Sequence, residues 1–267
     1  MYPIIFLFGK PVSMYAVMAI IGLLTAGVYF CRQIRRRGLD DNDAIIWLLV
    51  TCVGILLGGH IMFAITNLDK FHMYSEVGGF KDFINTSVQI FGGSVFYGGL
   101  IGGMIFASIW IRLKHLDFKT YSDIMASAAP LFHCFARVGC FLGGCCFGIE
   151  SHFGFTAHGN VLSPAVNDVS RFPVQLLEAA LNLVLFAVFG NLLKYERLKG
   201  RLFPMYLLSY SAIRFCDEFL RGDAVRGHVG LLSTSQWISI YIAVLGTAWF
   251  FIARKIKCSS ALHNHSA

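Results

Sequence analysis

Seven long apolar runs constrain the fold of this chain more than any other feature of its sequence. They cover residues 12–31, 44–66, 94–112, 121–142, 174–193, 202–220 and 234–253. A transmembrane helix needs about 20 mostly apolar residues. Only 14% of the residues are charged, against about 25% in soluble domains. We therefore predict an all-α integral membrane protein with about seven transmembrane helices, forming a single transmembrane domain over residues 1–267.

The basic residues between these runs predict the topology. Fourteen lie in alternate connections and the tail, namely Arg32, Arg35, Arg36, Arg37, Arg112, Lys114, Lys119, Lys194, Arg197, Lys199, Arg201, Arg254, Lys255 and Lys257. The opposite side holds six, namely Lys10, Lys70, Lys81, Arg171, Arg221 and Arg226. Because cytoplasmic loops carry the excess of Lys and Arg, we expect the N-terminus outside and the C-terminus in the cytoplasm. The net charge of +7 is then explained by the topology and by attraction to anionic lipids. We expect no nucleic-acid partner.

Two segments on the expected outer side are long enough to carry function. They are the external segments 67–93 and 149–172, whereas the cytoplasmic connections are short and basic. We therefore expect an active site that opens outward or into the outer leaflet.

Pairs of glycines four residues apart predict close helix contacts. The pairs are Gly54/Gly58, Gly98/Gly102, Gly99/Gly103 and Gly139/Gly143. For Gly98 and Gly99 a second reading is open, because glycine also lets the backbone approach a lipid headgroup. Tyr97, directly before them, could donate a hydrogen bond there or anchor the helix at the interface.

Two arginines, Arg137 and Arg214, lie within apolar runs. A charge at the centre of a membrane helix costs about 2.5–3.5 kcal/mol even on insertion scales. Each could pair with a carboxylate, Glu178 for Arg137, or could bind an anionic ligand, since the guanidinium fork matches phosphate oxygens. Helical spacing places Arg214, Glu218 and Arg221 on one face, a pattern that favours function over packing.

His133 precedes Arg137 by four residues, so the two share a helix face. It could be a buried structural histidine or a proton acceptor. Cys140, Cys145 and Cys146 lack the spacing of paired zinc-binding cysteines. We expect small-residue packing for them and no metal or cofactor, with a metal site completed by histidine or a redox role as alternatives.

The order of several motifs resembles one known family, the prolipoprotein diacylglyceryl transferases. The matching segments are Pro11–Tyr15, Gly92–Gly102, Arg137–Gly148, Phe172–Glu178, Tyr210–Arg221 and Ser233–Gln236. Together they cover nearly the whole chain, and that family has seven spans and an outward N-terminus.

The resemblance implies a multi-pass enzyme of the bacterial inner membrane. It would move diacylglycerol from phosphatidylglycerol to the lipobox cysteine thiol of a prolipoprotein, forming a thioether and releasing glycerol phosphate. Arg137 and Arg214 match the essential arginines of the family. From their places in the chain, and not from the resemblance, we expect Tyr97 and His133 to join them in catalysis. The substrate would be bound by Arg137, Gly98, Gly99, Glu178, Glu218, Arg221 and Tyr15.

The sequence departs from the family pattern at three positions. Tyr97 replaces a common histidine, Cys140 a common asparagine and Cys145 a common acidic residue. The chain therefore resembles a cysteine-rich branch of the family. The alternative is a paralogue that binds phospholipid or transfers a lipid group to another acceptor. A transporter has little support, because no inverted repeat is visible.

Overall fold

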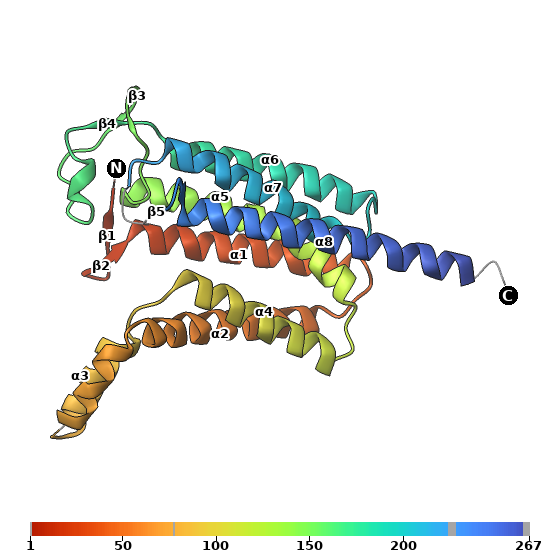
Figure 1. The fold of residues 1–267 in the computed structure, drawn as a ribbon, viewed down its shortest axis with the longest axis horizontal. Coiled ribbons are helices and arrows are strands. Elements are labelled where there is room, and N and C mark those ends of the chain that lie inside the picture. Colours follow the sequence, from red (N-terminus) through yellow and green to blue (C-terminus); the bar gives the residue numbers. More distant parts are fainter. Residues whose placement is uncertain (1, 77, 224–227, 264–267) are drawn as a thin grey trace. The chain divides into compact units, whose positions relative to one another are not determined.

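All seven apolar runs form helices in the computed structural model, which describes residues 2–76, 78–223 and 228–263. The helices are α1 (Met14–Arg35), α2 (Asp41–Thr66), α4 (Phe96–Leu113), α5 (Phe118–Gly143), α6 (Val174–Lys194), α7 (Leu202–Asp217) and α8 (Thr234–His263), drawn in Figure 1. Arg226, which the charge pattern predicts to be external, lies outside the described residues.

Five of these helices are long and apolar enough to cross a membrane, which makes the chain a multi-pass membrane protein. They are α1, α2, α5, α6 and the part of α8 over Thr234–Ile252. The apolar part of α4, Tyr97–Leu113, is shorter, and α7 has 16 residues. The count of seven spans stays a prediction. The run predicted over 202–220 is α-helical only to Asp217, and a 3-10 turn, η3 (Glu218–Leu220), follows it.

The connections contain short elements that the prediction of an all-α protein does not include. The segment 67–93 holds η1 (Leu68–Glu76) and helix α3 (Phe80–Phe91). Among the described residues, three two-stranded antiparallel sheets pair β1 (Ile4–Leu7) with β2 (Lys10–Ser13), β3 (Glu150–Thr156) with β4 (Ser170–Arg171), and β5 (His228–Val229) with β6 (Leu232–Ser233). The turn η2 (Pro164–Val166) completes the segment 149–172. Helices form the membrane spans, and the sheets lie between or before them.

Close contacts group the chain into two compact units. The first comprises Met1–Phe30 and Lys119–Ala267, and the second comprises Cys31–Phe118. The organisation as one transmembrane domain stays a prediction.

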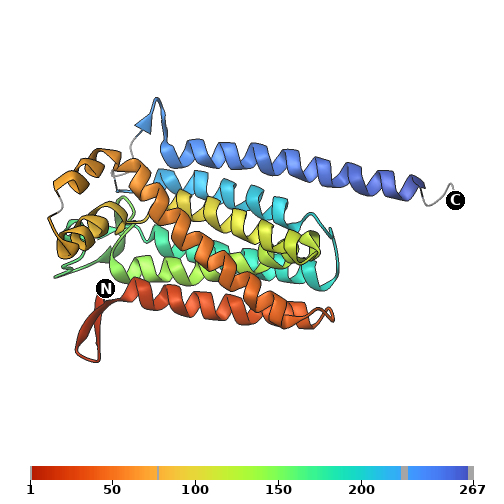
Figure 2. The same cartoon turned by 90° about the horizontal axis from the view of Figure 1, so that it is seen from below.

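Glycines let α2 and α4 pack closely within the second unit. A methyl group at Gly58 would collide with the carbonyl oxygen of Gly98, and one at Gly102 would collide with that of Gly54. Figure 2 shows the two ribbons crossing at short range. The indole Nε1 of Trp47 also donates to the carbonyl of Ala107 at 3.1 Å. The predicted glycine contacts are confirmed for these pairs.

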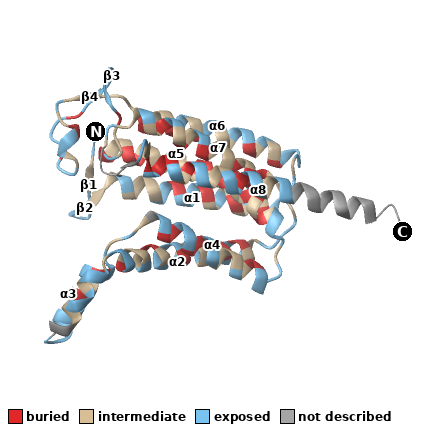
Figure 3. Ribbon diagram, in the orientation of Figure 1, coloured by how far each residue is buried: buried red, intermediate tan, exposed pale blue. Residues whose placement is uncertain are grey.

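Helix α5 carries much of the buried surface of the first unit, as Figure 3 shows. Its Gly139 faces α1, where a Cβ atom would lie 3.3 Å from the Cα of Tyr15. At its other end the buried Asp123 accepts hydrogen bonds from the backbone N–H groups of Gly200 and Leu202, the latter at 2.9 Å. Because Leu202 begins α7, this carboxylate holds the start of that helix against α5.

Candidate active site

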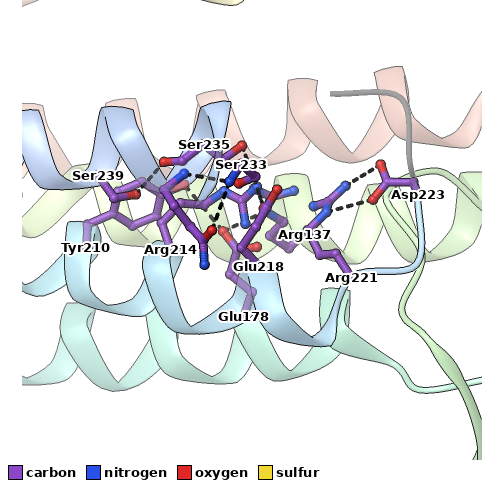
Figure 4. A network of polar contacts seen from close by, with 11 residues as sticks. Arg137, Glu178, Tyr210, Arg214, Glu218, Arg221, Asp223, Ser233, Ser235 and Ser239 are labelled. Carbon is purple, nitrogen blue, oxygen red and sulfur yellow. Dashed lines mark hydrogen bonds and ion pairs between the residues drawn. The ribbon is translucent and has the colours of Figure 1, made fainter. Parts of the chain in front are cut away.

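A buried ion pair joins α5 to α6 at the centre of the candidate site. Nε of Arg137 lies 2.9 Å from Oε1 of Glu178, and the Glu178 side chain is only 2% exposed. The hydroxyl of Tyr210, on α7, donates to the same carboxylate oxygen at 3.3 Å. Three helices therefore converge on one carboxylate (Figure 4). The carboxylate fixes how Arg137 presents its guanidinium group.

The second predicted arginine, Arg214, is also buried and ion-paired. Its Nη2 lies 2.5 Å from Oε2 of Glu218 and donates to Oγ of Ser235 at 3.1 Å. Its Nη1 is buried without a hydrogen-bond partner among the described residues. The carboxylate oxygen Oδ2 of Asp217 is likewise buried without a hydrogen-bond partner among the described residues. A buried donor without a hydrogen-bond partner destabilises the protein by about 1–3 kcal/mol. An oxygen atom of a bound ligand would accept a hydrogen bond from this Nη1 and remove that cost.

A local sequence signal places Ser235 beside Arg214. Backbone N–H of Ser233 donates to Oε1 of Gln236 at 3.0 Å, and backbone N–H of Gln236 donates to Oγ of Ser233 at 3.2 Å. This reciprocal pair is a capping box, and it fixes the start of α8. Ser235 lies in that first turn, where its hydroxyl reaches Arg214.

Arg221 does not share a helical face with Arg214 and Glu218, contrary to the prediction. The α-helix ends at Asp217, and Arg221 follows the 3-10 turn with extended backbone angles. Its guanidinium group pairs with Asp223 at 2.6 and 2.8 Å and contacts the thiol of Cys146. The helical repeat fails here because the chain leaves α7 before Arg221 is reached.

The three cysteines of the Arg137–Gly148 motif come together in space. The sulfur atoms of Cys140, Cys145 and Cys146 all lie within 4.8 Å of one another. The thiols of Cys140 and Cys145, together with the Arg221 guanidinium, hold the pKa of the Cys146 thiol below its ordinary value. Spacing along the chain did not indicate this cluster, because the turn after α5 brings the thiols together.

His133 lies on α5 one turn before Arg137, as predicted. Its Nδ1 is 2.9 Å from the hydroxyl of Tyr206, and its ring lies 4.8 Å from that of Tyr210 between centroids. Two tyrosines of α7 therefore hold the imidazole. Its role as a proton acceptor stays a prediction.

The remaining predicted residues divide between the two units. Tyr15 lies in the first turn of α1, in the first unit, and packs against Gly139, two residues after Arg137. Tyr97, Gly98 and Gly99 lie on α4 in the second unit. Gly98 packs on Gly58, which supports the packing reading. A headgroup contact by Gly98 and Gly99 stays a prediction.

Sequence reasoning missed several partners in the site. Asp223 pairs with Arg221, and Tyr206 pairs with His133. The Ser–x–x–Gln pattern at Ser233 could have indicated the helix start that presents Ser235. Nothing in the spacing indicates Tyr206, because its contact with His133 crosses 73 positions of the chain.

Comparison with known proteins places this arrangement in a family context. Residues 3–252 match the family model described as prolipoprotein diacylglyceryl transferase. A phosphatidylglycerol–prolipoprotein diacylglyceryl transferase of Clostridium tetani is 31% identical, with 95% of this chain and 98% of that protein covered. The second such protein of Clostridium perfringens is 34% identical, with 94% of each covered. One from Geobacter sulfurreducens is 30% identical, with 91% of each covered.

Proposed function

The chain belongs to the prolipoprotein diacylglyceryl transferase family, and from that membership we propose how its buried arginines serve the reaction. It is a transferase that moves a diacylglyceryl group from phosphatidylglycerol to prolipoproteins, as its relatives are named. Its membrane is the bacterial cytoplasmic membrane. It crosses that membrane seven times, with the N-terminus outside, in keeping with the seven apolar helices and the alternating basic residues.

The acceptor is the lipobox cysteine of the prolipoprotein signal peptide. Its sulfur attacks the glycerol carbon that bears the phosphate, so a C–S bond forms as the C–O bond to phosphate breaks. Glycerol phosphate leaves with the electron pair. Because negative charge grows on the phosphate ester, fixed donors that reach its oxygens lower the barrier.

Arg137 and Arg214 are the residues that bind this phosphate. The single observation that carries the assignment is the state of Arg214, which is 8% exposed and keeps a buried Nη1 without a partner among the described residues. Glu178 and Glu218 orient the two guanidinium groups through their ion pairs. Carboxylates in these positions also offset the cost of burying the cations before the lipid arrives.

The other site residues position the two substrates. Tyr15 lies beside the Arg137 motif and contacts the lipid. Arg221 contributes positive charge where the chain leaves α7. Tyr97, Gly98 and Gly99, on α4, are proposed to contact the lipid headgroup.

His133 takes the proton of the acceptor thiol. A neutral imidazole next to the reacting group is a suitable acceptor for that proton. Tyr97 occupies the position of the histidine common in the family, but tyrosine, with an ordinary pKa near 10, suits hydrogen bonding better than proton transfer.

Direct transfer tests the function. The purified full-length protein is placed in liposomes containing phosphatidylglycerol labelled in its acyl chains and is supplied with a lipobox peptide. We expect label on the peptide when it carries cysteine and none when that cysteine is serine. Labelling of neither peptide, by protein that retains its fold, would overturn the proposal. Label transferred to a different acceptor would identify a paralogue with another substrate.

A further inference from the structure

A cluster of three thiols lies next to the candidate active site without a role in the reaction described above. We propose that Cys140, Cys145 and Cys146 form a zinc site with one open coordination position, which takes the thiol of the acceptor peptide. This inference rests on the proposed function for the identity of the fourth ligand.

The geometry of the cluster fits thiolate coordination of zinc. Zn–S bonds are about 2.3 Å long, so sulfur atoms at tetrahedral corners lie about 3.8 Å apart. The three sulfur atoms lie within 4.8 Å of one another. Small side-chain rotations would bring the sulfur atoms to the separation of about 3.8 Å that a tetrahedral zinc ion requires. Cysteines that serve only as small packing residues have no need to point their sulfur atoms at one another.

The backbone holds the cluster in place. Helix α5 ends at Gly143, and Gly144 turns the chain with a φ of +78°. Cys146 also adopts a left-handed φ of +57°, which non-glycine residues rarely do and which surrounding structure must support. That support is visible, because the Gln175 amide donates to the carbonyl of Cys145 at 3.0 Å and the Asn160 amide donates to that of Gly143 at 3.2 Å.

The surroundings of the thiols resemble those of a metal centre with access on one side. Cys140 is buried, Cys146 is partly buried and Cys145 is exposed. The guanidinium group of Arg221 contacts the Cys146 thiol. Metal ligands are commonly oriented by a second hydrogen-bonding partner of this kind. The exposed side leaves room for an external ligand.

Three protein ligands leave a fourth position on a tetrahedral ion, as catalytic zinc sites do. A thiol that coordinates zinc is deprotonated at neutral pH. The acceptor here is a thiol, and its sulfur must be a thiolate to attack carbon. The S–H proton passes to His133 or to water, and the sulfur then forms the C–S bond as the C–O bond to phosphate breaks. The fold thus supplies thiolate where the family pattern has asparagine and an acidic residue.

Metal analysis and cobalt spectroscopy of the full-length protein in detergent test the site. We expect about one zinc ion per chain, as a single set of three thiolate ligands predicts. Cys145→Ser and Cys146→Ser should each lose most of the zinc, while Cys52→Ser on α2 should retain it as the matched control. Cobalt should show sulfur-to-metal absorption in the wild type, so the test does not depend on the folding of any variant.

A separate measurement tests whether the acceptor thiol is the fourth ligand of the metal. Adding a lipobox peptide should shift the visible bands of the cobalt protein, and a peptide with serine in place of cysteine should not. Absence of zinc and of sulfur-to-cobalt absorption, with transfer from phosphatidylglycerol intact, would overturn the site and leave the function standing. A disulfide among the three thiols that takes up no cobalt after reduction would also overturn it. Metal binding and a thiol-dependent shift without any transfer would support the site and overturn the proposed function.

Discussion

Arg137 on α5 and Glu178 on α6 form an ion pair of 2.9 Å inside the helix bundle. Each residue alone would be an isolated buried charge, and together they make a polar centre on which Tyr210 also converges. The pair reconciles the two readings of Arg137, because an arginine that pairs with a carboxylate through Nε can still direct its other donors toward a ligand.

Breaking this pair from one side should be worse than removing it. Glu178→Gln leaves a buried guanidinium group uncompensated, so we expect a loss of about 3–5 kcal/mol in the free energy of unfolding. The double variant Arg137→Gln with Glu178→Gln should be more stable than Glu178→Gln alone. Thermal unfolding in detergent measures both. Glu150→Gln, an exposed carboxylate 3.8 Å from Arg171, is the control. Equal stability of the single and double variants would show that the pair is not coupled.

Lysine cannot replace either buried arginine. Arg137→Lys and Arg214→Lys keep the charge but lose the planar fork that matches phosphate oxygens. We expect each to lower the transfer rate at least tenfold, which corresponds to about 1.4 kcal/mol of transition-state stabilisation. The assay uses labelled phosphatidylglycerol and a lipobox peptide at equal protein level, with Arg36→Lys on the expected cytoplasmic side as control. Rates near wild type in both variants would show that Arg137 and Arg214 do not bind the phosphate through the planar guanidinium fork.

The pH dependence of transfer separates His133 from Tyr97. If His133 accepts the thiol proton, the rate falls as pH drops and the imidazole becomes protonated. His133→Gln should then lower the rate and abolish that acid limb, in profiles measured from about pH 4 to pH 9. Tyr97→Phe should lower the rate and leave the pH profile unchanged, because its hydroxyl only positions the headgroup. An unaltered rate and profile in His133→Gln would exclude histidine as the proton acceptor.

Close packing of α2 on α4 should be sensitive to a single methyl group. Gly58→Ala and Gly98→Ala each place a Cβ atom against the opposite backbone, and overpacking of this kind costs about 1–3 kcal/mol. Gly79→Ala is the control, because nothing lies within 4 Å of an added Cβ there. Thermal unfolding should show lower stability for the first two variants only. Equal stability of all three variants would show that close packing of α2 on α4 does not stabilise the protein.

Reporter fusions test the orientation. Fusions after Arg37, Lys119 and Lys199 should report the cytoplasm, because the connections around them carry the excess of basic residues. Fusions near Lys81 and Asp168 should report the outer side. Two reversals among the five positions would overturn the seven-span arrangement.

The existence of the helices could be predicted because hydropathy acts locally. A run of some 20 apolar residues has to satisfy its backbone hydrogen bonds within itself once in lipid, so each predicted run became a helix. Only α8 departs far from its expected bounds, since it continues past residue 253 to His263. Prediction was weakest at the end of α7. Hydropathy continued to 220, but the backbone left the α-helix at Asp217 and took Arg221 out of the shared face.

By itself, the sequence determined the class of protein, the helices and the two arginines that had to be explained. Each of these follows from the free energy of transferring a short stretch of side chains from water into the membrane. Contacts with distant parts of the chain do not enter that free energy. Only the tertiary structure decided that Glu178 is the carboxylate that Arg137 contacts, which tyrosine holds His133, and that three thiols meet beyond α5. These contacts join residues far apart in the chain or depend on the geometry of one turn, and linear spacing carries no information about either.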